Sequence, residues 1–322
     1  MKTVICPICN GIDLTYNLKY TNICWPDLEY FNNLTVTCCN SCGFGFSVPE
    51  LSDEIVNQFY SSEYRRESSP FYLDFNKIEQ PYSMTYRSLS QIMLAKHFVS
   101  FSENDCFLDI GPGTGESFAT ARKVLPNPRC VAIELSTGAD LAYERVYKIK
   151  TFKTIQEFVD SRLKVKICLL SHSLEHYKLS WLKADLKKIR NLMDKGGILV
   201  AEVPFVDMRE HSALRFEDSP HFLFFSIESI KLLFENNGWN VLFAESAGEP
   251  YNDWLQKINA NKLIAKPRIF QNRIVKKSLS YLPKFAKKTF HYAISSKAID
   301  FKNVEFSYCG NRTCLRLVAS TH

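Results

Sequence analysis

The chain has 322 residues, of which 46% are hydrophobic and 23% charged, and its formal net charge is +6. This length suits one large domain with a smaller one, and the composition is ordinary for a globular protein with a sizeable core. No run of about 18 uncharged apolar residues exists, which argues against a membrane-spanning helix. The first residues also lack the apolar centre of a signal peptide. We therefore expect a cytoplasmic protein.

Two closely spaced cysteine pairs mark the start of the chain. Cys6 and Cys9 form one Cys-x-x-Cys pair, Cys39 and Cys42 form a second, and 29 residues lie between the pairs. Each pair can form a tight turn that presents two thiolates to one ion, and two such turns give a tetrahedral zinc site. Cys38 is an alternative to Cys39, although the two-residue spacing to Cys42 favours Cys39. The sequence therefore predicts zinc in a module that spans residues 1–49.

The predicted zinc is structural, because four thiolates close its coordination shell. A module of about 45 residues is too small for a core of its own, so metal binding would drive its folding. The alternative is a set of reduced, buried cysteines. Residues 50–104 follow as a linker and helical lid, with helical spacing of apolar residues from Tyr82 to Phe101. Within it, Tyr60 and Tyr64 are candidates to close over a pocket, with simple packing as the alternative.

A glycine-rich turn follows the lid. The apolar run Cys106–Ile110 leads into Gly111, Gly113 and Gly115, and residues 117–125 then have helical spacing. A strand, a glycine-rich turn and a helix in this order let the backbone approach a ligand closely, with amide hydrogens facing it. Several classes of nucleotide-binding enzyme share such a turn.

Three details narrow the choice of ligand. Glu116 stands where a dinucleotide-binding fingerprint has Gly or Ala. Asp109 ends the first strand, where a carboxylate can approach a cationic ligand. Glu134 ends the next apolar run, 19 residues after Gly115, and suits a carboxylate that binds both ribose hydroxyls. These features indicate a ribose-containing ligand with a cationic part.

Strands and helices alternate over the rest of the chain, which indicates a mostly parallel sheet with its ligand at the carboxyl ends of the strands. The expected elements are strands at 165–170, 198–203, 241–244 and 314–319 and helices at 181–193 and 226–237. We predict an α/β fold with a doubly wound, mostly parallel sheet built from residues 105–250 and 303–322.

Residues 1–245 resemble bacterial class I S-adenosylmethionine-dependent methyltransferases that carry an N-terminal zinc-binding domain. The resemblance rests on the cysteine pairs, the glycine turn, Glu134, the run Leu174–His176 and the Gly196-Gly197 turn. It implies a seven-stranded, Rossmann-like methyltransferase sheet. It also implies S-adenosylmethionine as the cofactor, with the glycine turn around its methionine part and Glu134 on its ribose. It also assigns Ser171 to the cofactor site.

Members of this group C-methylate nucleotide-linked deoxysugars, and related enzymes modify surface polysaccharides. The resemblance therefore implies a small-molecule or glycan acceptor, a sugar, with C- or O-methylation as the reaction. No Asn-Pro-Pro-Tyr motif, which amino-directed nucleic-acid base methyltransferases carry, follows the fourth strand. We therefore expect no nucleic-acid partner.

Three histidines lie at the predicted mouth of the active site. His172 and His176 flank Glu175 after the fourth strand, and His221 follows the fifth. Histidine suits the removal of a proton near neutral pH from a hydroxyl or an acidic carbon. If residues 172–176 form a helical turn, both imidazoles share one face. His172, Glu175 and His176 are alternatively a two-histidine, one-acid metal site, and each histidine has packing or helix capping as an alternative role.

The sugar C-methyltransferases that this chain resembles take their base from a Tyr-x-Glu-His motif followed by aromatics and Ser. His221–Ser226 matches the second half of the motif. Asp218 stands in place of the tyrosine, and Pro220 stands in place of the glutamate that would orient the histidine. The match is partial, and Asp218 is a candidate to replace the missing acid.

Residues 251–302 form a basic segment with twelve Lys or Arg against two acids. Apolar residues alternate with these charges, as in amphipathic helices that lie on anionic membrane surfaces. The alternatives are a helical insertion with a solvated basic face or a dimer contact, and nucleic-acid binding, for which no known motif is present. One interpretation therefore places the protein at the inner membrane face.

Two rival functions remain at the level of sequence. A nicotinamide-dependent oxidoreductase has a similar sheet, but Glu116 and the zinc module count against it. A non-catalytic binding protein with the same fold is the second rival, because the glutamate expected before His221 is missing.

Overall fold

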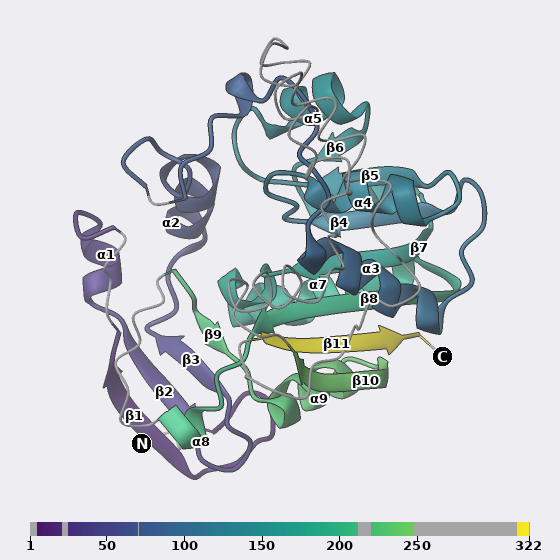
Figure 1. Cartoon of the computed structure of the whole chain (residues 1–322). Helices are drawn as coiled ribbons and strands as arrows, with labels where there is room; N and C mark the ends of the chain where they lie inside the picture. Colours follow the sequence, from purple (N-terminus) through teal and green to yellow (C-terminus); the bar gives the residue numbers. More distant parts are fainter. Residues whose placement is uncertain (1–4, 21–24, 70, 212–219, 248–313, 322) are drawn as a thin grey trace, which may run out of the picture.

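The structure is a computed structural model that describes residues 5–20, 25–69, 71–211, 220–247 and 314–321 (Figure 1). Asp218 and the basic segment 251–302 lie outside the described residues, and the interpretations of them remain predictions. No helix among the described residues has the length and apolar character needed to cross a membrane.

Seven strands form the main sheet, in the order β10-β11-β8-β7-β4-β5-β6. All neighbours pair in parallel except β11, which runs antiparallel to both β8 and β10. The strands are β4 (Cys106–Ile110), β5 (Arg129–Ile133), β6 (Lys150–Phe152), β7 (Val165–Ser171), β8 (Met193–Pro204), β10 (Asn240–Ala247) and β11 (Cys314–Ser320). The predicted α/β class and the seven-stranded, mostly parallel sheet are confirmed.

Helices cover both faces of this sheet, because successive strand residues point to opposite sides. In β4, Leu108 packs into one core and Phe107 into the other. The helices on the Phe107 side are α3 (Tyr86–Phe98), α4 (Glu116–Val124) and α5 (Ala139–Tyr147). Those on the Leu108 side are α6 (Ile155–Asp160), α7 (Leu179–Leu192) and α9 (Ile227–Asn236). The apolar side chains of this strand thus pack into two separate cores, one on each face of the sheet.

A second, smaller sheet has four antiparallel strands (Figure 1). One of these strands ends with Cys38 and Cys39. The strands of this sheet are β1 (Leu14–Lys19), β2 (Thr35–Cys39), β3 (Gly45–Val48) and β9 (Leu223–Phe224). The last of these comes from the segment between β8 and α9 and pairs with β3 through Gly45 and Phe46. The small sheet is therefore completed by a strand that begins two residues after His221.

Short helices connect the two sheets and the strands of the core. They are α1 (Glu29–Asn32), α2 (Asp53–Gln58), a π-helix at Phe59–Glu63, a 3-10 turn at Phe75–Lys77, a 3-10 turn at Leu174–His176 and α8 (Met208–His211). The predicted lid helix is present as α3, which the capping box of Thr85 and Ser88 starts.

Two local expectations differ from the structure. The Gly196-Gly197 turn was expected to precede a strand at 198, but β8 begins at Met193, which already pairs with Val165 of β7. Residues 172–176 do not form one helical turn, because the 3-10 turn begins at Leu174 and His172 has a left-handed φ of 52°. The two imidazoles are therefore not placed by helical periodicity.

Candidate functional site

The two cysteine pairs meet in one cluster. The Sγ atoms of Cys6 and Cys42 lie 3.7 Å apart, and those of Cys9 and Cys39 lie 3.5 Å apart. One sulfur atom from each of the four residues lies within 4.8 Å of the others. Cys39, and not Cys38, is the cysteine of this adjacent pair that joins the cluster.

The turns that carry these cysteines rest on the main core. Four side chains donate hydrogen bonds to their backbone carbonyls: Lys183 to Pro7 (2.7 Å), Asn236 to Ile8 (2.9 Å), Arg209 to Ser41 (3.3 Å) and Ser226 to Cys42 (2.6 Å). Ser226 is also the N-cap of α9. The cysteine cluster and the helices of the main sheet are therefore parts of one packed unit.

The glycine turn has the backbone that its residues predicted. Gly111, Gly113 and Gly115 have φ values of 76°, 58° and 80°, in the left-handed region that favours glycine. A Cβ atom on Gly115 would lie 2.8 Å from the ring of Tyr147, so a larger residue has no room there. Tyr143 and Tyr147 of α5 donate hydrogen bonds to the carbonyls of Gly113 and Thr114. Both tyrosines were missed at the level of sequence.

A cavity of about 410 Å³ opens where β4, β5 and β7 end. The residues just after these strands line it, namely Gly111, Glu134, His172 and Ser173. This is the edge of a parallel sheet at which ligands bind. Four of the predicted site residues line the cavity: Gly111, Glu134, His172 and His176.

The two predicted cofactor acids lie at this edge. Glu134 is buried and its Oε1 accepts a hydrogen bond of 3.0 Å from the amide of Ser136. Asp109 is buried behind the turn, and its Oδ2 accepts a hydrogen bond from Ser117. Its Oδ1 has no hydrogen-bond partner among the described residues. Burial, and to a smaller extent Glu134, raise the pKa of Asp109 to about 7, although Ser117 acts in the opposite direction.

Ser171 does not line this cavity. Its hydroxyl accepts a hydrogen bond of 2.8 Å from Gln91 of α3. Ser173, two residues on, lines the cavity instead and donates a hydrogen bond of 2.7 Å to the carbonyl of Ile110. A Cβ atom on Gly111 would lie 2.8 Å from this hydroxyl. Both its left-handed φ and this close contact therefore favour glycine at position 111.

Glu175, His176 and His221 form a cluster that meets the cavity through His176. The ring centroids of His176 and His221 lie 4.9 Å apart, and one ligand atom from each of the three residues lies within 4.8 Å of the others. His221 does not line the cavity but lies behind His176, which does. His221, which is 45 residues away from His176 in the sequence, thus joins Glu175 and His176 in the folded structure.

Burial controls the ionisation of this cluster. It lowers the pKa of His176 to about 3, so that its imidazole is neutral near pH 7. Burial alone would raise the pKa of Glu175, but hydrogen bonding by His172 and the neighbouring imidazoles bring it to about 2. A carboxylate therefore stands beside two imidazoles, while the Nδ1 of His176 has no hydrogen-bond partner among the described residues.

His172 belongs to a separate network. Its Nδ1 lies 3.3 Å from Glu175 Oε1, and its Nε2 lies 3.2 Å from Glu202 Oε1. Burial alone would lower the pKa of His172, but hydrogen bonds to Cys314, Glu175 and Glu202 hold it well above the usual range. The metal set proposed from His172, Glu175 and His176 is not among the ligand groups that the described residues form. Apart from the cysteine cluster, these groups are Glu175–His176–His221 and His172–Glu202–Cys314.

Glu202 and Arg316 were missed at the level of sequence. They face each other across β8 and β11, and the Nε of Arg316 donates a hydrogen bond to Glu202 Oε2. Burial alone would raise the pKa of Glu202, but Arg316 and His172 hold it below the usual range. The signal was one acid inside the apolar run of β8 and one base inside that of β11, because buried charges occur in pairs.

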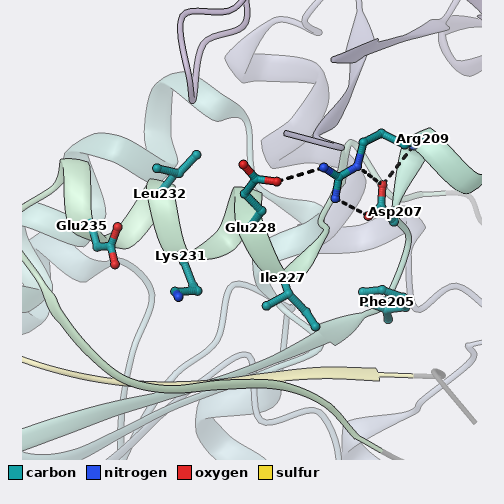
Figure 2. Close-up of a pocket in the computed structure, with 8 residues that line it drawn as sticks. All are labelled: Phe205, Asp207, Arg209, Ile227, Glu228, Lys231, Leu232 and Glu235. Atoms are coloured by element: carbon teal, nitrogen blue, oxygen red, sulfur yellow. Dashed lines mark hydrogen bonds and ion pairs between the residues drawn. The ribbon is translucent and has the colours of Figure 1, made fainter. Parts of the chain in front are cut away.

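A second hollow is bounded by Phe205, Asp207, Arg209 and α9 (Figure 2). Figure 2 shows the guanidinium of Arg209 between the carboxylates of Asp207 (2.6 Å) and Glu228 (2.9 Å). The same arginine donates to the carbonyl of Ser41 in the second cysteine turn. None of the predicted site residues lines this hollow, and its arginine serves to attach the cysteine turn.

Comparison with known proteins gives the following results. Residues 85–243 match the family described as the methyltransferase domain. No curated protein matches the chain significantly.

Several solved structures have partial similarity. An S-adenosylmethionine-dependent methyltransferase from Archaeoglobus fulgidus is 16% identical, with 72% of this chain and 93% of that chain covered and a TM-score of 0.42. The cyclopropane synthase MmaA2 from Mycobacterium tuberculosis is 15% identical, with 84% and 94% covered and a TM-score of 0.43. Phosphoethanolamine N-methyltransferase 2 from Haemonchus contortus is 14% identical, with 71% and 52% covered and a TM-score of 0.41.

The family match covers the glycine turn, Glu134 and the histidine cluster, while Tyr60, Tyr64 and Arg65, which also line the cavity, lie outside the matched segment. The match favours a methyl donor as the cofactor over nicotinamide, which the sequence alone did not exclude. Residues 85–243 therefore form a class I S-adenosylmethionine-dependent methyltransferase domain, and the protein is an S-adenosylmethionine-dependent methyltransferase.

Proposed function

We propose that this methyltransferase transfers the methyl group of S-adenosylmethionine to a sugar, either nucleotide-linked or part of a glycan precursor. The observation that carries the proposal is that one cavity joins a cofactor end to an imidazole end. Gly111 and Glu134 line the first end, and His172 and His176 line the second. A cavity of about 410 Å³ falls within the range of small-ligand pockets.

The cofactor end matches the parts of S-adenosylmethionine. Glu134 would accept hydrogen bonds from the ribose hydroxyls, and the glycine turn would lie along the methionine part. Asp109, with one buried oxygen that lacks a hydrogen-bond partner, suits a cationic group of the cofactor. The bound cofactor supplies an activated methyl group, and the protein has to align it with the acceptor.

At the imidazole end, His176 would take a proton from the acceptor, and His221 and Glu175 would hold it in place. A pKa of about 3 makes the free imidazole of His176 neutral but only weakly basic, so the Glu175 carboxylate would have to stabilise the imidazolium as the proton is transferred. In the sugar C-methyltransferases that this chain resembles, a glutamate before the histidine orients it. Pro220 stands there in this chain, and the carboxylate of Glu175, within 4.8 Å of His221, is the replacement that we propose.

The remaining cavity wall suits a sugar. Tyr60, Tyr177 and Trp181 supply aromatic surface that can pack against the apolar face of a sugar ring. Lys153 and Lys188 also line the cavity and offer positive charge to the phosphates of a nucleotide-linked substrate.

Cys6, Cys9, Cys39 and Cys42 would hold a structural zinc ion. The four sulfur atoms lie within 4.8 Å of one another, close enough to bind a single ion. Four thiolates are the ligand set of a tetrahedral structural zinc site. The ion would stabilise the two turns that the main core contacts through Lys183, Asn236, Arg209 and Ser226. It would take no part in methyl transfer, since all four ligand positions are filled by thiolates.

The proposal is tested by incubating the full chain with S-adenosylmethionine and a panel of nucleotide sugars and measuring S-adenosylhomocysteine. With an active sugar in hand, His176→Asn should lower kcat by about 10²–10⁴-fold, the usual contribution of a general base, while leaving cofactor binding unchanged. His97→Asn, on the exposed side of α3, is the matched control and should keep full activity. Turnover with a non-sugar acceptor alone would overturn the sugar assignment and leave the methyltransferase assignment in place.

A further inference from the structure

Arg65 follows the π-helix Phe59–Glu63 and reaches the cofactor end of the cavity from outside the family-matched segment. It lines the cavity together with Gly111 and Glu134. A Cβ atom built on Gly113 would lie 3.4 Å from Nη2 of Arg65, so the guanidinium lies directly against the second glycine of the turn. This arginine therefore faces the place where the methionine part of the cofactor would lie.

The guanidinium is held in place but not neutralised. Nη1 donates a hydrogen bond of 3.2 Å to the carbonyl of Phe71, and the guanidinium carbon lies 4.7 Å from the centre of the Tyr64 ring. The buried Nε has no hydrogen-bond partner, and no carboxylate within the described part of the chain forms an ion pair with Arg65. Its neighbour Arg66 differs, because it pairs with Asp27 (2.5 Å) and Glu63 (3.0 Å).

The segment before Arg65 is hydrogen-bonded to the loop after β5, which begins with Glu134. The amide and the hydroxyl of Thr137 both donate hydrogen bonds of 3.0 Å to the carbonyl of Ser61. The hydroxyl of Ser136 donates one of 3.4 Å to the carbonyl of Tyr60. These contacts fix the π-helix to the loop after β5, so Arg65 and Glu134 have a defined position relative to each other. π-Helical turns often occur at functional sites, because they shift the side chains that follow.

We propose that Arg65 binds the carboxylate of the methionine part of S-adenosylmethionine. That end of the cofactor carries one ammonium and one carboxylate group. Glu134 provides negative charge on this part of the cavity wall, and Arg65 provides the positive charge that a carboxylate requires. An unpaired guanidinium has donors in a planar fork that matches a carboxylate. Arg65 is thus a binding residue that lies outside the methyltransferase domain as the family defines it.

The proposal rests on S-adenosylmethionine as the cofactor and not on the identity of the acceptor. It is tested by calorimetric titration of the full chain with S-adenosylhomocysteine and with its decarboxylated analogue, S-adenosyl-3-thiopropylamine. Arg65→Gln should weaken S-adenosylhomocysteine about 10- to 100-fold, the usual loss for a charge-assisted hydrogen bond, and should hardly change the affinity for the analogue. Arg65→Lys should restore part of the loss, because it keeps the charge without the fork.

Arg66→Gln is the matched control and should bind both ligands as the wild type does. Equal weakening of both ligands by Arg65→Gln would overturn the proposal, since the arginine would then only support the fold of the lid. Unchanged affinity for S-adenosylhomocysteine, with weaker binding of uridine diphosphate, would overturn it in favour of an acceptor phosphate. Failure of the wild type to bind S-adenosylhomocysteine would instead remove the cofactor assignment itself.

Discussion

Asp109 is a carboxyl group whose pKa of about 7 makes it half protonated at neutral pH before any cofactor binds. A cationic group beside its Oδ1 favours the carboxylate and lowers that pKa. Binding of S-adenosylmethionine should therefore release a proton from Asp109, and the affinity should rise as the pH rises through about 7. Calorimetry at pH 7 in buffers of different ionisation enthalpy measures the number of protons released.

Asp109→Asn is the control for this proton release. The amide keeps the shape of the carboxyl group but has no proton to lose, so its binding enthalpy should not depend on the buffer. Ser117 still has an oxygen to which it can donate its hydrogen bond. Buffer-independent enthalpy in the wild type would show that Asp109 does not face the cation.

The pairing of β8 with β11 brings Glu202 opposite Arg316, and this pair is buried. Arg316→Met should lower the free energy of unfolding by about 3 kcal/mol, because it removes one partner of a buried ion pair. Arg87 also pairs with Glu202, at 3.3 Å, but its side chain is 52% exposed. Arg87→Met should therefore cost less than about 1 kcal/mol. Denaturant unfolding of both variants measures the difference, and equal losses would contradict this ranking.

The cysteine turns and β9 connect the small sheet to the residues around His221. If zinc holds the turns, Cys9→Ser should lower the zinc content from one ion per chain and lower the melting temperature by several degrees. The strand pairing of β3 with β9 should loosen with the turns, so His221 should also lose order. Metal analysis and thermal unfolding with and without a chelator measure these effects.

Cys38→Ser is the control, because Cys38 is adjacent to Cys39 in the sequence but does not belong to the four-cysteine cluster. It should keep its zinc. Full zinc content in Cys9→Ser would contradict the four-thiolate site, and a second bound ion in the wild type would point to the Glu175–His176–His221 group.

At the scale of the whole molecule, buried titratable groups act on stability in opposite directions. His176 has a usual pKa of 6.5 and a folded value of about 3, so its contribution is present above pH 6.5 and is lost as the pH falls. Asp109 has a usual pKa of 3.8 and a folded value of about 7, so its contribution is present below pH 3.8 and is lost as the pH rises. Between these values the two contributions oppose each other.

Single variants should separate the two effects. Relative to the wild type, His176→Gln should become more stable as the pH falls from 6.5 toward 4.5, and Asp109→Asn should become more stable as the pH rises from 4 to 7. Below pH 4.5 the wild type should lose stability as Glu175, with a folded pKa of about 2, begins to protonate in the unfolded chain. Urea unfolding from pH 3.5 to 8 measures all three trends, and parallel curves would contradict them.

The sequence predicted the features that local physics decides. The mostly parallel sheet followed from the order of apolar runs and helical patterns, although the short edge strand β6 was not among the expected strands. The left-handed backbone of Gly111, Gly113 and Gly115 followed from residue type. The cysteine pairs predicted which sulfur atoms meet, because each pair lies within one tight turn. The position of Glu134 followed because strand ends at one edge of a parallel sheet lie together.

The tertiary structure alone decided which charged groups share the site. His172 was expected to share a helical face with His176, but its left-handed φ turns it toward Glu202, and His221 takes the place beside His176. Arg65, Glu202 and Arg316 come from the lid and from two strands that are far apart in the chain. Their proximity depends on strand order and on the packing of the lid, and no spacing along the sequence encodes either.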